Sequence, residues 1–71
     1  METITITTEF IRLQDLMKLS NMVSSGGEAK LLIQNGKVLV NGEACLQRGK
    51  KLRPGDTVTY GNRTCTTAYA T

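Results

Sequence analysis

Histidine and tryptophan are absent from this chain, and aromatic residues make up only 4% of its 71 residues. Histidine is the most usual general base near neutral pH and a common zinc ligand, so its absence argues against both kinds of site. The two cysteines, Cys45 and Cys65, cannot complete a zinc site by themselves. We therefore expect no catalytic residue, no metal, no cofactor and no small-molecule substrate, and we predict that the protein is not an enzyme.

Long apolar runs are also missing. No stretch approaches the roughly 18 residues that cross a bilayer, and the Thr-rich, acidic N-terminus lacks the apolar region of a signal peptide. We expect a cytoplasmic protein without a membrane partner. Its cysteines are then expected to be reduced thiols on half-buried strands, with one disulfide as the alternative.

The composition fits one small folded domain over residues 1–71. Hydrophobic residues make up 39% and charged residues 21%, which is typical of a soluble globular chain rather than a disordered one. A chain of this length buries only about 60% of its unfolded surface, so its core is small.

The positive charge is localised. The net charge is +3, yet the segment 24–53 alone holds six basic and two acidic residues. The basic residues of that segment are Lys30, Lys37, Arg48, Lys50, Lys51 and Arg53. Localised cations attract polyanions, either nucleic acid or an anionic membrane.

The first half of the chain predicts a strand and two short helices. Residues 3–7 alternate Thr and Ile, as a half-buried strand does. From Arg12 onward, Leu13, Leu16 and Met17 repeat at helical spacing. The second helix is predicted to begin at Ser25, with Glu28 three residues later as in a capping box, and to end at Asn35-Gly36. Its buried stripe is predicted to be Ala29, Leu32 and Ile33.

The second half predicts strands and turns. Strands are expected at residues 37–40, 43–46, 57–60 and 63–69, with turns at Asn41-Gly42, Pro54-Gly55-Asp56 and Gly61-Asn62. Residues 47–53 are expected to be a polar, basic connection. The order implies an α+β fold in which an αα-hairpin packs on a small, mostly antiparallel sheet.

The basic residues carry the main functional hypothesis. If the strands on either side of Asn41-Gly42 pair, Lys37 comes close to the segment 48–53, and Lys30 lies seven residues upstream. Such a cluster would hold phosphates, which supply most of the affinity for nucleic acid and little of its sequence preference. The alternative is a solvated loop that keeps the protein soluble.

Two further features are weaker. Free amides of Ser25, Gly26 and Gly27 at a helix start could bind a phosphate, or these residues could simply form a cap and a tight turn. The three aromatic residues, Phe10, Tyr60 and Tyr69, are predicted to lie in the core or sheet. They are too few for a base-stacking surface, which favours recognition of RNA backbone and shape.

Taken in order, several motifs resemble the S-four domain, the RNA-binding module named for ribosomal small-subunit protein four. They are Arg12-Leu13, Val23-Ser24-Ser25, Glu28-Ala29-Lys30-x-Leu32-Ile33-x-x-Gly36-x-Val38-x-Val40-Asn41-Gly42 and Leu52-x-Pro54-Gly55-Asp56-x-Val58. The match covers about residues 10–60. Within the family, the stretches 25–30 and 48–56 more narrowly resemble small stand-alone bacterial proteins of the YaaA/YbcJ type.

The resemblance implies binding of structured RNA, ribosomal or tRNA-like, and a link to a ribosomal subunit or its assembly. Phosphate contacts are then expected from the six basic residues of segment 24–53, with secondary contacts from Arg12 and the amides of Ser25, Gly26 and Gly27. Larger members of the family usually carry Ser-Arg at the start of the second helix, and that Arg touches RNA. Gly26 stands at that position here.

Two other functions fit parts of the same sequence. A protein-interaction adaptor could use the same basic face to dock an acidic partner. A β-grasp sulfur carrier shares the Asn-Gly-Glu hairpin and the Gly-Asp turn, but it needs a C-terminal Gly-Gly where this chain ends Thr-Ala-Tyr-Ala-Thr.

Overall fold

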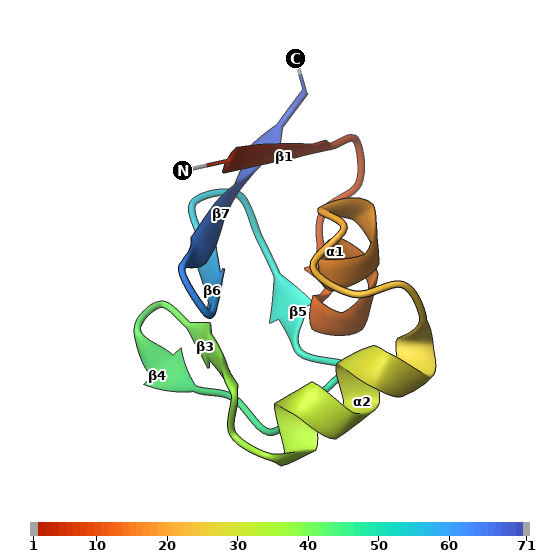
Figure 1. Ribbon diagram of the computed structural model, residues 1–71. Coiled ribbons are helices and arrows are strands. Elements are labelled where there is room, and N and C mark those ends of the chain that lie inside the picture. The colour runs from red at the N-terminus through yellow and green to blue at the C-terminus, as the bar shows by residue number, and fades with distance from the viewer. Residues whose placement is uncertain (1, 71) are drawn as a thin grey trace.

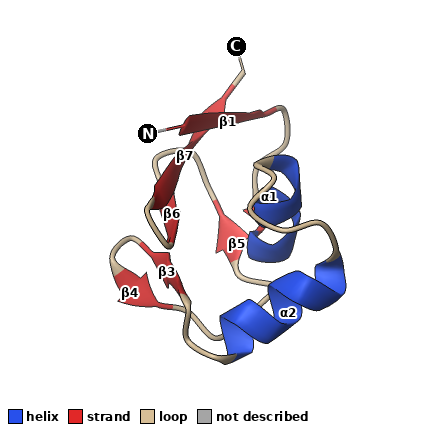
Figure 2. Ribbon diagram, in the orientation of Figure 1, coloured by secondary structure: helices blue, strands red, loops and turns tan. Residues whose placement is uncertain are grey.

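Two helices lie on one side of a five-stranded sheet in the computed structural model, which describes residues 2–70 (Figure 1). The helices are α1 (Leu13–Leu19) and α2 (Gly26–Gln34). Figure 2 shows both helices in blue beside the red strands. The predicted α+β architecture is confirmed for these residues; positions 1 and 71 of the predicted domain lie outside them.

The large sheet is mixed but mostly antiparallel. Its strands, in spatial order, are β1 (Glu2–Ile6), β7 (Arg63–Tyr69), β6 (Thr57–Tyr60), β3 (Val38–Val40) and β4 (Glu43–Ala44). The first and last strands of the chain, β1 and β7, pair in parallel, and the other neighbours are antiparallel. Residues from both ends of the chain therefore share one edge of the sheet.

A second, two-stranded sheet lies between the large sheet and α1. It pairs β2 (Ile11–Arg12) with β5 (Lys51–Leu52) in antiparallel register. The prediction that residues 47–53 are only a polar connection is wrong at this point. A strand of two residues is too short to show alternation in the sequence, yet Leu52 is fully buried and fixes the register.

The same segment caps α1. Arg12 occupies the N-cap position but makes no side-chain cap, so the first amides of the helix need other acceptors. The Leu13 amide donates to the Lys50 carbonyl (2.9 Å) and the Gln14 amide donates to the Arg48 carbonyl (3.1 Å). The basic segment is thereby hydrogen-bonded to the start of the helix.

The predicted cap of α2 is confirmed, with one difference. The Glu28 amide donates to Ser25 Oγ (3.2 Å), as the capping-box spacing requires. The Glu28 carboxylate accepts from the amide (2.8 Å) and hydroxyl (3.2 Å) of Ser24, one residue before the cap. At the other end, Gly36 has the predicted positive φ of 71°.

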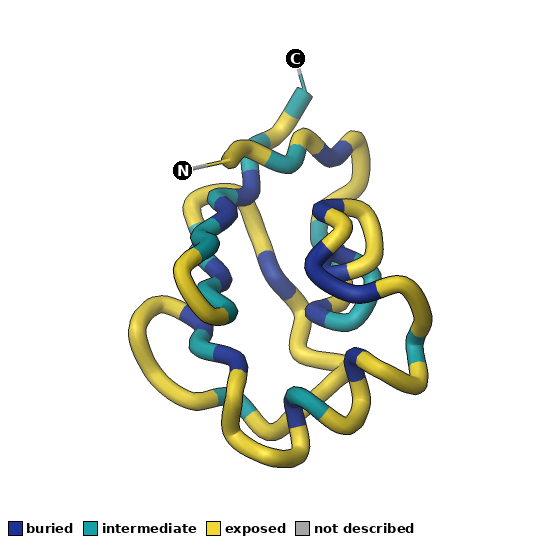
Figure 3. Tube along the Cα trace, viewed as in Figure 1, coloured by how far each residue is buried: buried dark blue, intermediate teal, exposed yellow. Residues whose placement is uncertain are grey.

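The core lies between the helices and the sheet. Figure 3 shows its buried positions in dark blue on the facing sides of these elements. The largest fully buried side chains are Leu13, Leu16, Met17, Ile33, Leu52, Val38, Val58, Thr67 and Cys65. In the predicted stripe of α2, Ala29 and Ile33 are buried, whereas Leu32 is only partly so.

The two cysteines differ in environment. Both are free thiols. Cys65 lies on β7 and is fully buried, and this burial raises the pKa of its thiol. Cys45 is half-buried as predicted, but it follows β4 instead of lying on a strand. The N–H of Cys45 nonetheless donates to the Val38 carbonyl (3.0 Å), which extends the hairpin by one hydrogen bond.

The tip of the β3–β4 hairpin is tied to the turn before β6. Asn41 and Gly42 have φ angles of 52° and 86°, as predicted for this turn. Asn41 Oδ1 accepts from the Thr57 amide (2.9 Å), and Asn41 Nδ2 donates to Asp56 Oδ1 (3.0 Å). One side chain therefore joins two turns that are 15 residues apart.

Replacing this side chain should destabilise the fold. In Asn41→Ala we expect the free energy of unfolding to fall by about 1–3 kcal/mol, because three side-chain hydrogen bonds are lost, one to Asp56 and two to Thr57, and alanine disfavours positive φ. Urea denaturation measures this. Asn62→Ala is the control, since Asn62 is an exposed turn residue with ordinary φ, and its change should stay within about 0.5 kcal/mol. An equal loss of unfolding free energy in both variants would contradict the stabilising role of the Asn41 side chain.

Candidate nucleic-acid interface

All seven cations predicted to contact phosphate are exposed, and none forms an ion pair with any residue in the range 2–70. They are Arg12, Lys30, Lys37, Arg48, Lys50, Lys51 and Arg53. The chain has nine basic residues in all. The remaining two are paired, Lys18 with Asp15 (3.5 Å) and Arg63 with Glu2 (2.6 Å). The fold therefore leaves the cations that were predicted to contact RNA without an ion-pair partner among residues 2–70.

Two of these cations face each other across the small sheet. Arg12 and Lys51 are register partners in the β2–β5 pair. Directly opposite residues of an antiparallel pair lie on the same face, and like charges there repel. No carboxylate of the described chain forms an ion pair with either side chain. This face therefore carries two adjacent positive charges that no carboxylate of residues 2–70 pairs with, and it favours the approach of an anion.

Phe10 lies beside this pair. Its ring centroid is 4.9 Å from Lys51 Nζ and 6.0 Å from Arg12 Cζ. Phe10 was predicted to lie in the core or the sheet. The structure instead leaves it half-buried beside the exposed cations. The only signal in the sequence was the i, i+2 spacing of Phe10 and Arg12, which places both on one face of an extended segment.

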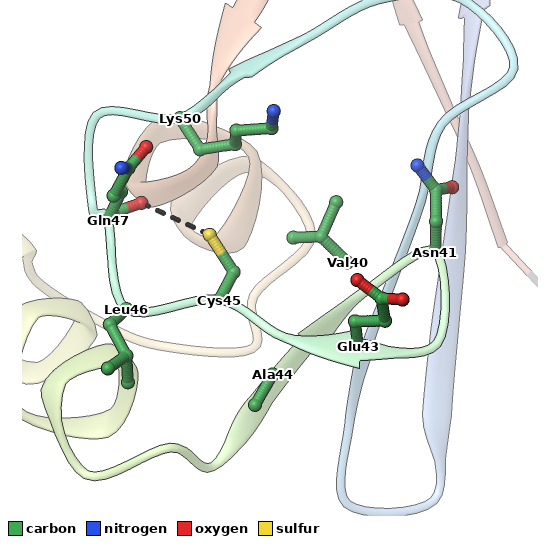
Figure 4. Close-up of a pocket in the computed structure, with 8 residues that line it drawn as sticks. All are labelled: Val40, Asn41, Glu43, Ala44, Cys45, Leu46, Gln47 and Lys50. Carbon is green, nitrogen blue, oxygen red and sulfur yellow. Dashed lines mark hydrogen bonds between the residues drawn. The ribbon is translucent and has the colours of Figure 1, made fainter.

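Lys50 lies on an open hollow between the β3–β4 hairpin and the segment that follows it. Figure 4 shows the Lys50 side chain extending across this hollow toward Val40 and Asn41. The Cys45 thiol points toward Gln47 and donates to its carbonyl (3.6 Å) (Figure 4). Lys50 thus extends the positive surface from the small sheet toward the hairpin.

Arg53 is held in place through Asp56. The Arg53 amide donates to Asp56 Oδ2 (2.8 Å), while Asp56 Oδ1 accepts from Asn41. These two hydrogen bonds lower the pKa of Asp56 from its ordinary value of 3.8, the bond from Arg53 contributing most. Partial burial opposes this shift, and the charges of Lys50 and Arg53 add to it.

The other predicted contacts lie around α2. Lys37 follows the helix, and its amide donates to the Leu32 carbonyl (3.0 Å). The hydrogen bond from Cys45 to Val38 brings the chain back beside Lys37, three residues before Arg48. Lys30 is exposed on α2 itself. Pairing of the hairpin, the condition for Lys37 to approach the segment 48–53, is confirmed.

Ser25 and Glu28 have structural roles at the start of α2, as the cap alternative requires. The carboxylate of Glu28 there also offsets part of the positive end of the helix dipole. Gly26 and Gly27, unlike Ser25 and Glu28, have no evident structural role. Neither has a positive φ, and a Cβ built at Gly26 would meet nothing within 4 Å. Packing does not require glycine here, and the backbone is open to a close approach.

These features define a class of protein. The basic residues of segment 48–53 are all exposed. Within residues 2–70, no helix is long and apolar enough to cross a bilayer. A small fold with seven exposed, unpaired cations, two of them opposite each other in one strand pair, has the character of a nucleic-acid-binding domain.

Comparison with known proteins identifies the family. A family model described as S4 domain, the S-four module that the sequence resembles, matches residues 4–67, so the chain belongs to the S4 domain family. It is an RNA-binding protein of this family rather than an enzyme.

Two relatives are informative. The chain is 46% identical over 55 residues to a Bacillus subtilis (strain 168) protein named "Probable ribosome maturation protein RlbA", with 78% of each chain covered. It also matches the solution structure of YbcJ from E. coli with a TM-score of 0.73 and 29% identity, covering 96% of this chain and 87% of that one. That structure is described as revealing an αL motif involved in RNA binding.

Acid should weaken the anchor of Arg53. Above pH 3.8 the Asp56 carboxylate is charged in folded and unfolded chains, so its stabilisation is fully present. As the pH falls below 3.8 toward the lower folded pKa, the unfolded chain binds the proton first and this stabilisation is lost. We expect Asp56→Asn to be less stable at neutral pH and less acid-sensitive, as measured by urea denaturation from about pH 6 to pH 2.

Glu43→Gln is the control, because Glu43 is an exposed carboxylate without a hydrogen bond to a described residue. The lowered pKa of Glu2, due mainly to its hydrogen bond from Arg63, adds an acid sensitivity that all these proteins share. Equal acid profiles for wild type and Asp56→Asn would contradict the proposed anchor.

Proposed function

We propose that this protein binds ribosomal RNA during maturation of a ribosomal subunit, in the cytoplasm. The observation that carries the proposal is the set of seven exposed, unpaired cations, two of which, Arg12 and Lys51, face each other in the β2–β5 pair. The relative named as a ribosome maturation protein supports the choice of ribosomal over tRNA-like RNA.

The proposed contacts are electrostatic. Phosphates are held by Lys30, Lys37, Arg48, Lys50, Lys51 and Arg53, and Arg12 with the amides of Ser25, Gly26 and Gly27 makes additional contacts. Folded RNA brings phosphates of separate strands close together, so a compact protein can bind several at once. Its wide, shallow minor groove also exposes 2′-hydroxyl groups, which favour recognition by shape.

An acidic protein partner would use the same cations, so removing charge alone does not separate it from RNA. Binding to purified RNA in the absence of other proteins does separate them. For roughly five phosphates on a single strand, the slope of log affinity against log salt is expected near −3.5.

Single charge removals test which cations contact phosphate. In Lys51→Ala the salt slope should become shallower by about 0.7, because one counterion-releasing contact is lost. Lys18→Ala is the matched control, since Lys18 is also an exposed lysine but is paired with Asp15. Fluorescence anisotropy with a structured fragment of ribosomal RNA at several salt concentrations measures both.

The control should keep the wild-type slope. A flat salt dependence of the wild type would contradict phosphate binding altogether. Equal slopes for wild type and Lys51→Ala, with a change in Lys18→Ala, would place the interface on another face.

Association with the ribosome is tested in cells. We expect the wild type to sediment with ribosomal precursor particles and the double variant Arg12→Glu/Lys51→Glu to remain in the free fraction, because reversed charges repel phosphate. The double variant Lys18→Glu/Asp15→Lys keeps the net charge of the wild type and should still sediment. Free migration of the wild type, with RNA binding retained in vitro, would contradict the ribosomal role alone.

A further inference from the structure

Phe10 has an environment that the stability of the fold does not explain. Its side chain is half-buried, and among residues 2–70 it is not part of the apolar cluster that forms the core. The partly buried apolar residues that do pack on that core are Ile4, Ile11, Leu32, Cys45 and Tyr60. Phe10 instead contacts two cations at the surface.

Phe10, Arg12 and Lys51 share one face. Residues two apart on extended backbone point the same way, which aligns Phe10 with Arg12. Register pairing of Arg12 with Lys51 places the third side chain on that face. The distances from the ring centroid, 4.9 Å to Lys51 Nζ and 6.0 Å to Arg12 Cζ, agree with this placement.

The charge arrangement on this face is unfavourable in the free protein. Arg12 and Lys51 repel each other, and the aromatic ring compensates only in part through its negative face. Neither cation pairs with a carboxylate of the described chain. Glu9, which precedes Phe10, is exposed on a bend and forms no ion pair with a described residue. A ligand that suits this cluster carries a negative charge for the two cations and a flat aromatic ring that can stack on Phe10.

An RNA nucleotide with an unpaired base has both properties. Every base has a π-face that stacks on an aromatic ring, and each of its flanking phosphates carries a negative charge. The Lys51 ammonium sits on a flexible stem, so it can move from the ring to a phosphate when a base arrives. The Arg12 guanidinium can bind the other phosphate through two donors.

We propose that Phe10 is a stacking site for one unpaired RNA base, whose flanking phosphates are held by Arg12 and Lys51. This site rests on the proposed function, because it uses the same basic face. It adds a preference for a bulged or looped nucleotide to a surface that would otherwise recognise only backbone and shape. The sequence predicted recognition of RNA backbone and shape alone, and the stacking site adds contact with one base.

The test compares two hairpin RNAs that differ in one feature. The first carries a single bulged 2-aminopurine in its stem, and the second has the same stem fully paired. Binding is measured by anisotropy, and the environment of the bulged base by 2-aminopurine fluorescence. The variants are Phe10→Leu and Phe10→Met, which keep apolar bulk without a π-face, and Phe10→Tyr, which keeps the ring. Circular dichroism and thermal unfolding establish that each variant is folded.

We expect Phe10→Leu and Phe10→Met to bind the bulged hairpin roughly five-fold or more weakly than wild type. Their affinity for the paired hairpin and their salt slopes should not change, because no charge is removed. The fluorescence change on binding should be lost in both and restored in Phe10→Tyr.

Three results would overturn the stacking site. If Phe10→Leu and Phe10→Met bind the bulged hairpin as wild type does, RNA binding stands but Phe10 does not stack. If they lose affinity equally for both hairpins, Phe10 only positions its neighbouring cations. If the wild type binds neither hairpin, phosphate binding by this face and the stacking site fail together.

Discussion

The short pairing of Ile11–Arg12 with Lys51–Leu52 is the constraint on which the basic surface depends. It joins the chain just before α1 to the end of the cationic segment. The amides of Leu13 and Gln14 continue this contact by donating to the carbonyls of Lys50 and Arg48. A helix of seven residues, which lacks a side-chain cap, thus obtains its acceptors from a loop, and the loop in turn obtains a fixed path.

A second anchor fixes the far end of the same segment. Asp56 accepts from the Arg53 amide and from Asn41, whose carbonyl oxygen accepts from Thr57. Residues 48–53 are therefore held by α1 on one side and by the hairpin tip on the other. Preorganisation of this kind matters for RNA binding, because a disordered basic loop would pay the cost of ordering when it binds.

The two anchors explain why the cations can remain unpaired. Backbone hydrogen bonds and the buried side chain of Leu52 determine the path of the segment, so its cationic side chains are not needed to hold it in place. The cations outside the proposed surface are used differently. Arg63 bonds to Glu2 and to the Ser20 carbonyl (2.6 Å), and so ties the β6–β7 hairpin to β1 and to the end of α1.

Local signals in the sequence were sufficient for the helices and the turns. Ser25 with Glu28, Gly36 and Asn41-Gly42 act within a few residues, and each has the predicted role. The parallel pairing of β1 with β7 and the β2–β5 pair join segments that are distant in sequence, so no local pattern indicated them. Phe10 was missed for the same reason, because Lys51 reaches it only through the folded register. The identities of the basic residues were predictable, whereas their division between the small sheet, the hollow and α2 was not.

Amide chemical shifts of the labelled protein during titration with a structured ribosomal RNA fragment test the central claim most directly. The account predicts that the largest shifts occur at residues 10–12 and 48–53, while the segments around Lys18 and Arg63 stay unchanged. Large shifts confined to the β1–β7 edge or to the face of Lys18, with residues 48–53 unaffected, would contradict it.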